Sequence, residues 1–429
     1  MISKHLLLAF SWAEFKKNKT LHSTTITKKS NTMTKTFFTL TLLLFSICGF
    51  SLTAQSILEN PKALKSALLQ NNVWPKKIFV GYSKLKNPIY AYFYNRSGTD
   101  NAMIIGGVHG SEFYGVDVVH AIKDSLDKMK NQKFKWRVLL IAELFPDNVK
   151  KGRQNIFKEN YGRKTCDICN GQKEENECIN HCVDPNRQMP GIDSLYRNGK
   201  TTTAQNGPIE IENQYLLFIT QTFNPSRIVS VHCKNGVAEW MTDEEKQEHE
   251  SKNRQIGIFA DPRTITIYHD TLNNNQKKHR PKNIALNYHI DEMLTLKMAF
   301  LVKENKGIIT GNFIDKKYVR TIDEKTKEPA YNLIDVSYLN TIYPLDEAAA
   351  DEGSPQIRSF EKNGGKVSFG TWASTRIKEK KDAIMLTIEL PQYYSFFSKK
   401  NDLSTLDIPK LKANTNAYVN AIAKVFLEN

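Results

Sequence analysis

Apolar segments typical of buried strands alternate along this chain with segments of helical periodicity. After the first such run, residues 102–106, apolar side chains recur at helical spacing at Val116, Val119, Ile122 and Leu126. Strands that alternate with helices predict an α/β fold, in which a mostly parallel mixed sheet carries helices on both faces. Further strands are expected at residues 76–83, 89–95, 136–144, 227–232 and 383–390, the first two of them antiparallel, and further helices at 209–223, 284–305 and from 406 onward.

The N-terminal part of the chain has the pattern of an export signal. Lys28, Lys29 and Lys35 precede the apolar run "FFTLTLLLFSICGF", which is shorter than the roughly 18 residues that a membrane span needs. We therefore expect residues 1–32 to be an extension ahead of a start at Met33, and residues 33–54 to be a signal peptide cut after Ala54. The mature protein, residues 55–429, would be periplasmic or secreted and without a membrane span. An uncleaved anchor is the alternative.

The charge of the chain does not indicate a nucleic-acid partner. The formal net charge is +15, but the Lys and Arg residues are scattered rather than arranged in a stripe.

Four cysteines lie close together in "CDICNGQKEENECINHC", at Cys166, Cys169, Cys178 and Cys182. In an exported chain this spacing predicts two disulfides in the loop 166–182. A structural zinc site or free thiols are the alternatives, and the pairing is open. Cys233 is left over.

The segment "GGVHGSE" places His109 and Glu112 directly after a predicted strand, and His232 ends another one. Sites in open α/β sheets form beyond the carboxyl ends of the strands. Two imidazoles and one carboxylate are a donor set typical of catalytic zinc. Turn chemistry and a structural histidine would explain the same residues without a metal.

Five segments occur in the order and placement found in a known family: "GGVHGSE", "FPDNVKKGRQN", "VDPNRQMPG", "SVHCKNG" and "MLTIELP". Together they resemble the zinc metallocarboxypeptidases, the carboxypeptidase A-like peptidases, and most nearly the bacterial murein-peptide amidases. The succinylglutamate desuccinylase and aspartoacylase branch is a relative. The resemblance implies the zinc carboxypeptidase-like α/β fold, with an insertion at about 248–363.

The resemblance also implies roles for single residues. His109, Glu112 and His232 resemble the ligands of one catalytic Zn²⁺, and Asp184 resembles the acid that fixes a ligand histidine. The remaining correspondences are Asn186 and Arg187 for the grip on the substrate's terminal carboxylate, Arg153 for the arginine that polarises the scissile carbonyl, and Glu389 for the general base that acts on zinc-bound water. Glu389 stands out without the family, because a carboxylate between Ile388 and Leu390 on an apolar strand is costly unless it is used.

One feature departs from the family pattern. The family carries a mobile tyrosine ahead of the base, whereas the comparable stretch here, "GTWASTR", offers Trp372, Ser374 and Thr375. The charged segment "MTDEEKQEHE" is expected to be a solvated helix. His269, His279 and His289 are expected to be surface or packing residues.

The sequence thus predicts an exported zinc metallopeptidase, a carboxypeptidase or amidase, that hydrolyses an amide bond next to a free carboxylate in peptides, including cell-wall peptides. A zinc deacylase of N-acyl amino acids is one alternative. A non-catalytic peptide- or glycan-binding module on the same fold is another.

Overall fold

The structure is a computed structural model, and its described residues all belong to the unit Ala54–Asn429. The expected boundaries at residues 32 and 54 and most of the insertion at 248–363 lie outside the described residues. These are 55–130, 135–157, 161–166, 182–191, 194–234, 236–252, 257–261, 294–295, 297–310, 318–322, 329–333, 366–377 and 383–427.

A seven-stranded mixed sheet forms the centre of this unit, with the strand order β1-β2-β4-β3-β7-β11-β8. Strands β4, β3, β7 and β11 are parallel to one another, and the two edges are antiparallel. The strands are β1 (Val73–Tyr82), β2 (Pro88–Asn95), β3 (Asp100–Ile105), β4 (Trp136–Ile141), β7 (Arg227–Lys234), β8 (Ile258–Ala260) and β11 (Ile384–Pro391). The predicted α/β fold and the antiparallel pair β1–β2 are confirmed.

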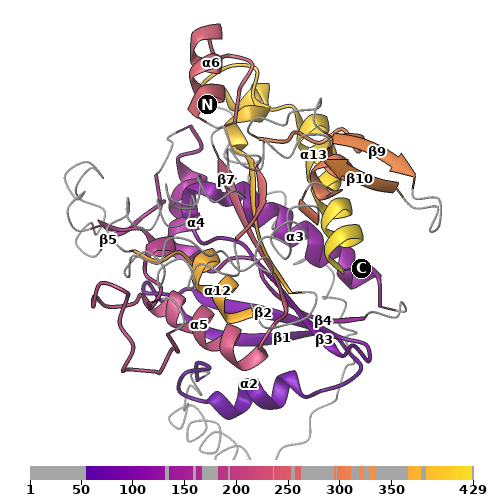
Figure 1. The fold of residues 1–429 in the computed structure, drawn as a ribbon. Coiled ribbons are helices and arrows are strands. Elements are labelled where there is room, and N and C mark those ends of the chain that lie inside the picture. The colour runs from indigo at the N-terminus through magenta and orange to yellow at the C-terminus, as the bar shows by residue number, and fades with distance from the viewer. Residues whose placement is uncertain are drawn as a thin grey trace, which may run out of the picture. The chain divides into compact units, whose positions relative to one another are not determined.

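Helices cover both faces of the sheet (Figure 1). Helices α3 (Phe113–Lys128) and α13 (Ile408–Ile422) pack on one face, and α2 (Pro61–Leu68), α5 (Ile211–Phe223) and α12 (Phe369–Ile377) on the other. Because side chains alternate along a strand, β3 supplies Ala102 and Ile104 to the α3 face but Met103 and Ile105 to the α5 face. Strands buried on both faces read as continuous apolar runs, which is the pattern seen in the sequence.

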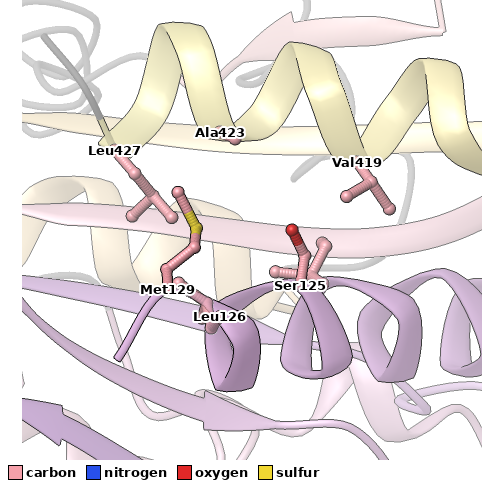
Figure 2. A pocket seen from close by; sticks show the side chains of 7 residues that line it. Ser125, Leu126, Met129, Val419, Ala423 and Leu427 are labelled. Carbon is pink, nitrogen blue, oxygen red and sulfur yellow. The ribbon is translucent and has the colours of Figure 1, made fainter. Parts of the chain in front are cut away.

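Helix α3 and the C-terminal helix pack closely enough to leave only a small cavity between them (Figure 2). Its volume is about 10 Å³, which is at the lower limit for holding one water molecule. It is lined by Ile122, Ser125, Leu126, Met129, Val419, Ala423 and Leu427. This cavity is therefore a packing gap between the two helices.

The remaining elements are short. They are helices α4 (Pro146–Gln154) and α6 (Asp243–Lys252), strand pairs β5–β6 (Thr165–Cys166, Cys182–Val183) and β9–β10 (Tyr318–Ile322, Pro329–Leu333), 3-10 turns η1 (Gly110–Glu112), η3 (Pro185–Arg187), η5 (Tyr393–Phe396) and η6 (Leu403–Thr405), and the π turn η7 (Ala423–Leu427). Helix α6 is the charged helix expected from the sequence. Among the described residues, none of the helices combines the length and the apolar character that crossing a membrane requires.

Candidate active site

The turn that carries His109 and Glu112 is held against helix α4 by backbone contact. A Cβ added to Gly110 would lie 2.0 Å from the carbonyl carbon of Asn148, and one added to Gly152 would lie 2.1 Å from the Gly110 oxygen. Gly107 adopts a φ of 70°, which favours glycine. The two glycines "GG" and the glycine after His109 therefore let the chain leave β3 and turn directly into η1 and α3.

His109, Glu112 and His232 form one buried group, and their side chains are at most 4% exposed. The Nδ1 atom of His109 lies 2.8 Å from Glu112 Oε1, and Nδ1 of His232 lies 2.8 Å from Glu112 Oε2. The backbone N–H of Cys233 also donates to Glu112 Oε2, at 3.3 Å. Each imidazole thus directs the same nitrogen at one of the two carboxylate oxygens.

The opposite nitrogen of each imidazole has its own polar partner. Nε2 of His109 lies 2.8 Å from Asp184 Oδ1, and Nε2 of His232 lies 2.9 Å from Ser230 Oγ. Such partners hold the ring orientation, and the Asp184 carboxylate, which can only accept, favours the His109 tautomer that leaves Nδ1 free to bind a metal. Ser230 was not predicted, although its place two residues before His232 puts both side chains on one face of β7.

The charges in this group shift its pKa values. Burial lowers the pKa of His109, but the charge of Glu112 and the hydrogen bonds that His109 donates to Asp184 and Glu112 outweigh this effect and raise the pKa to about 9. Burial raises the pKa of Glu112, but His109 and His232 lower it well below its usual value. Glu112 is therefore an ionised carboxylate ready to act as a ligand.

The donor set fits a zinc ion. One ligand atom from each of His109, Glu112 and His232 lies within 4.8 Å of the other two. Two imidazole nitrogens and a carboxylate oxygen are ligands that zinc accepts, and such a three-residue set leaves a coordination position open for chemistry.

Glu389 lies beside this group because of the register of the sheet. Residue 389 of β11 is the direct neighbour of His232 on β7. The side chains of Ile388 and Leu390 belong to the core on the α3 face, so Glu389 points to the other face, as His232 does. It is half-buried, and burial together with the charge of Glu112 raises its pKa despite the opposing effect of His232.

The segment around Asp184 is anchored on two helices. The Asn186 side-chain oxygen accepts a hydrogen bond from the backbone N–H of Phe369, at the start of α12, at 3.0 Å. Asn213 of α5 donates to the Pro185 carbonyl at 2.8 Å. Arg187 donates to the Asn186 carbonyl at 2.8 Å. The carboxylate of Asp184 stays ionised, because the hydrogen bond and charge of His109 and the charges of the nearby arginines lower its pKa more than burial raises it.

The arginine that reaches the His–Glu–His group is Arg163, which no sequence motif singled out. Its Nη1 donates to Glu112 Oε1 at 2.7 Å, and its Nη2 lies 3.6 Å from Asp184 Oδ2. Arg153 instead pairs with Asp117 on α3 and lies 5.3 Å above the Phe113 ring. Among the described residues, it is therefore Arg163, rather than Arg153, whose guanidinium contacts Glu112 and Asp184.

A backbone contact of Gly162 explains why Arg163 lies next to Glu112. Gly162 has a φ of 81°, its carbonyl accepts the N–H of Gly110 at 3.0 Å, and a Cβ on it would lie 2.6 Å from the Asn148 oxygen. The sequence signal that could have indicated this is the glycine in "YGR", directly before the cysteine loop.

The other residues singled out in the sequence are placed as follows. Trp372 is fully buried in α12 and donates its indole N–H to the Ser194 carbonyl at 2.9 Å, so it is a core residue. Ser374 is also buried. His269, His279, His289, Cys169 and Cys178 lie outside the described residues, as does the Thr375 side chain. For Cys166 and Cys182 the structure describes only the backbone, which pairs them directly across β5–β6. Cys233 is buried and unpaired, as predicted.

Comparisons with known proteins give the following. No family model and no curated protein matches the chain. Among solved structures, it is similar to bovine thrombin-activatable fibrinolysis inhibitor in complex with tick carboxypeptidase inhibitor, at 14% identity over 86% of this chain and 95% of that one, with a TM-score of 0.40. It is also similar to a metallo-carboxypeptidase from Pseudomonas aeruginosa, at 11% identity, 85% and 68% coverage and a TM-score of 0.37. A third structure is the carboxypeptidase A from Helicoverpa armigera, at 13% identity, 51% and 58% coverage and a TM-score of 0.29.

Proposed function

We propose that the chain is an exported zinc metallopeptidase, a carboxypeptidase or amidase, which hydrolyses an amide bond next to a free carboxylate in cell-wall or other small peptides. The observation that carries this proposal is the buried group of His109, Glu112 and His232 with Glu389 in register beside it. A protein that only binds peptides has no need for this last carboxylate, because burying an acid without using it costs stability.

In the proposed mechanism the zinc ligands and Glu389 have different roles. Zinc bound to the three ligands supplies a Lewis acid that polarises a carbonyl oxygen and makes water more acidic. Glu389 accepts the proton of the attacking water and passes it to the leaving amine, a role for which its raised pKa suits it.

Two arginines complete the proposed site. Arg163 lies next to Glu112 and Asp184, where its guanidinium can donate to the negative charge that develops on the scissile oxygen. Arg187 is the proposed partner of the substrate's free carboxylate, which a guanidinium binds through two hydrogen bonds.

The first experiment compares Glu389→Gln with Glu244→Gln, a matched change on the exposed face of α6. We expect the first variant to keep its zinc, measured by elemental analysis, and to lose turnover by about 10²-fold or more. The control should match the wild type. A Glu389→Gln variant that hydrolyses peptides at the wild-type rate would remove Glu389 from the mechanism.

The second experiment compares Arg163→Met with Arg153→Met. If Arg163 stabilises the transition state, its loss should lower kcat by about 10²-fold. Arg153→Met should leave kcat nearly unchanged and cost at most about 1 kcal/mol of stability, because its pair with Asp117 is partly exposed. The reverse order of effects on kcat would restore Arg153 to the role expected from the sequence.

The substrate class is tested with a panel of muropeptides, other small peptides and N-acyl amino acids, with the products identified by mass. Free and amidated forms of one good peptide are compared, and amidation should weaken binding as Arg187→Gln does. Turnover of acyl amino acids alone would establish a deacylase. Binding without turnover of any substrate by the zinc-loaded protein would establish a binding module.

A further inference from the structure

A second pocket lies at the opposite end of the sheet from the candidate active site. It has a volume of about 660 Å³. It is formed by α2, by the segment 196–198, by the start of β4 and by the last residues of α5. Arg137 is paired with residue 101 at the amino end of β3, whereas His109 follows the carboxyl end of that strand. The length of β3, about 17 Å, therefore separates the two places.

The charge of this pocket is entirely positive. Lys65, Arg137 and Arg197 line it, and no Asp or Glu does. In the part of the chain that the structure describes, none of these three side chains forms an ion pair. Three cations that converge on one hollow without a carboxylate repel one another and favour an anion between them.

Arg137 is held in place by neutral groups. Its Nε donates to the side-chain oxygen of Asn101 at 2.7 Å, and its guanidinium carbon lies 5.9 Å from the centre of the Phe223 ring. Asn101 is fixed in turn, because its amide donates to the Phe223 carbonyl. The head group is therefore oriented without being neutralised, and its two terminal nitrogens keep the fork geometry that matches a carboxylate or phosphate.

The rest of the lining combines apolar side chains with neutral polar ones. Leu69 is 75% exposed and Phe218 is half-buried, so both offer apolar surface to the pocket. The wall beside them is fixed by a pair of hydrogen bonds between the Tyr196 backbone and the Gln221 side chain, at 2.6 and 3.0 Å. A ligand that fills this space would need an apolar part as well as an anionic one.

We propose that this pocket binds a small organic anion, with its carboxylate or phosphate group on Arg137 and Arg197 and an apolar ring or chain against Leu69 and Phe218. Its volume falls in the range of about 300–1,000 Å³ that is typical of small-molecule sites. This inference does not depend on the proposed hydrolytic activity, since it concerns other residues and is read out by binding.

The test is isothermal titration of the full-length zinc-loaded protein with four probes: 3-phenylpropionate, phenyl phosphate, inorganic phosphate and the neutral 3-phenylpropan-1-ol. The variant is Arg137→Gln/Arg197→Gln, because a glutamine amide in place of the first guanidinium can still donate to Asn101. Its control is Lys399→Gln/Lys412→Gln, which removes the same charge from exposed sites elsewhere. Thermal unfolding checks that both proteins are folded.

We expect one class of binding sites for the ring-bearing anions to weaken at least tenfold in the double arginine variant and to persist in the lysine control. Comparing 3-phenylpropionate with phenyl phosphate and inorganic phosphate shows whether the pocket prefers a carboxylate or a phosphate group. Anions can also bind at the zinc and Arg187, and that class should survive in the double arginine variant. If Arg137→Gln unfolds the protein, the single change at exposed Arg197 carries the test. Equal affinity and stoichiometry in the arginine variant and the wild type, or equally tight binding of the neutral alcohol, would overturn the proposal.

Discussion

The hydrogen bond between Asp184 and His109 should control how tightly the site holds zinc. Asp184 Oδ1 accepts from two groups, His109 Nε2 at 2.8 Å and the backbone N–H of Asn186 at 2.9 Å. In Asp184→Asn, the amide oxygen must occupy the Oδ1 position, because only an oxygen can accept from both donors. The tautomer of His109 is then kept, and the loss is that of the negative charge, which makes such a hydrogen bond roughly twice as strong as a neutral one.

The expected magnitude follows from that difference. Changes to the partner of a ligand histidine typically cost about 10–100-fold in metal affinity. We expect Asp184→Asn to weaken zinc binding by about tenfold, or about 1.4 kcal/mol, because it loses charge but keeps the acceptor. Asp184→Ala removes the acceptor as well, so it should fall near the roughly 100-fold end of the range.

The assay is competition for zinc with a chromophoric chelator, and a matched control separates the metal effect from the turn. Asp402 occupies the same local position, at the start of the 3-10 turn η6, where its Oδ1 accepts the N–H of Ser404 at 3.0 Å, but it contacts no histidine among the described residues. Asp402→Asn should leave zinc affinity unchanged. Equal zinc affinity in Asp184→Asn, Asp184→Ala and the wild type would refute the reasoning, and so would a larger loss in Asp184→Asn than in Asp184→Ala.

Three further predictions concern the fold around the site. Gly110→Ala should destabilise the protein by about 3 kcal/mol in chemical denaturation. The control is Gly207→Ala, whose Cβ meets only the Thr203 hydroxyl at 3.3 Å, and it should cost about 0.5 kcal/mol or less. Similar costs for the two variants would contradict the contact of Gly110 with α4. Burial raises the pKa of Glu212 from 4.5 to about 7, so the contribution of this group to stability is full below pH 4.5 and is lost as the pH rises through 7. Glu212→Gln should therefore raise the free energy of unfolding by up to about 3 kcal/mol at about pH 8 and by little at about pH 4. An effect that does not depend on pH would contradict this reasoning. Cys166 and Cys182 are directly opposed on β5 and β6, and the α-carbons of such antiparallel pairs lie about 4.5–5.5 Å apart, a distance that a disulfide can span. Non-reducing peptide mapping should therefore find Cys166 joined to Cys182, and not to another cysteine of the loop.

The sequence was most informative where the structure is periodic. Strands β3, β7 and β11 are buried on both faces, so their sequences are mostly apolar. The few polar residues within them are therefore easy to recognise. His232 and Glu389 could be placed on strands for this reason. That the two are neighbours, however, depends on the register of β7 against β11, and no local pattern encodes the pairing of strands that lie far apart in the chain.

The two arginines show the limit of such reasoning. Arg153 and Arg163 both lie in polar, basic stretches without periodicity, and the family pattern "KGRQN" favoured Arg153. Which guanidinium reaches Glu112 is decided by the docking of Gly162 on Gly110, a contact between backbone segments some fifty residues apart. The partner of Arg153, Asp117, is likewise set by the packing of α4 on α3.

The contact between Gly110 and Gly152 fixes how closely the turn that carries His109 and Glu112 can approach helix α4. Peptide planes touch there with no side chain between them, and a peptide plane has no rotamers to change. We therefore expect substitutions in the surrounding core to repack without moving the turn, since the distance across this contact is set by the van der Waals radii of rigid peptide groups. For the same reason the contact does not tolerate a side chain. A methyl group on either glycine would displace the whole of helix α4, and with it the segment at Gly162 that positions Arg163.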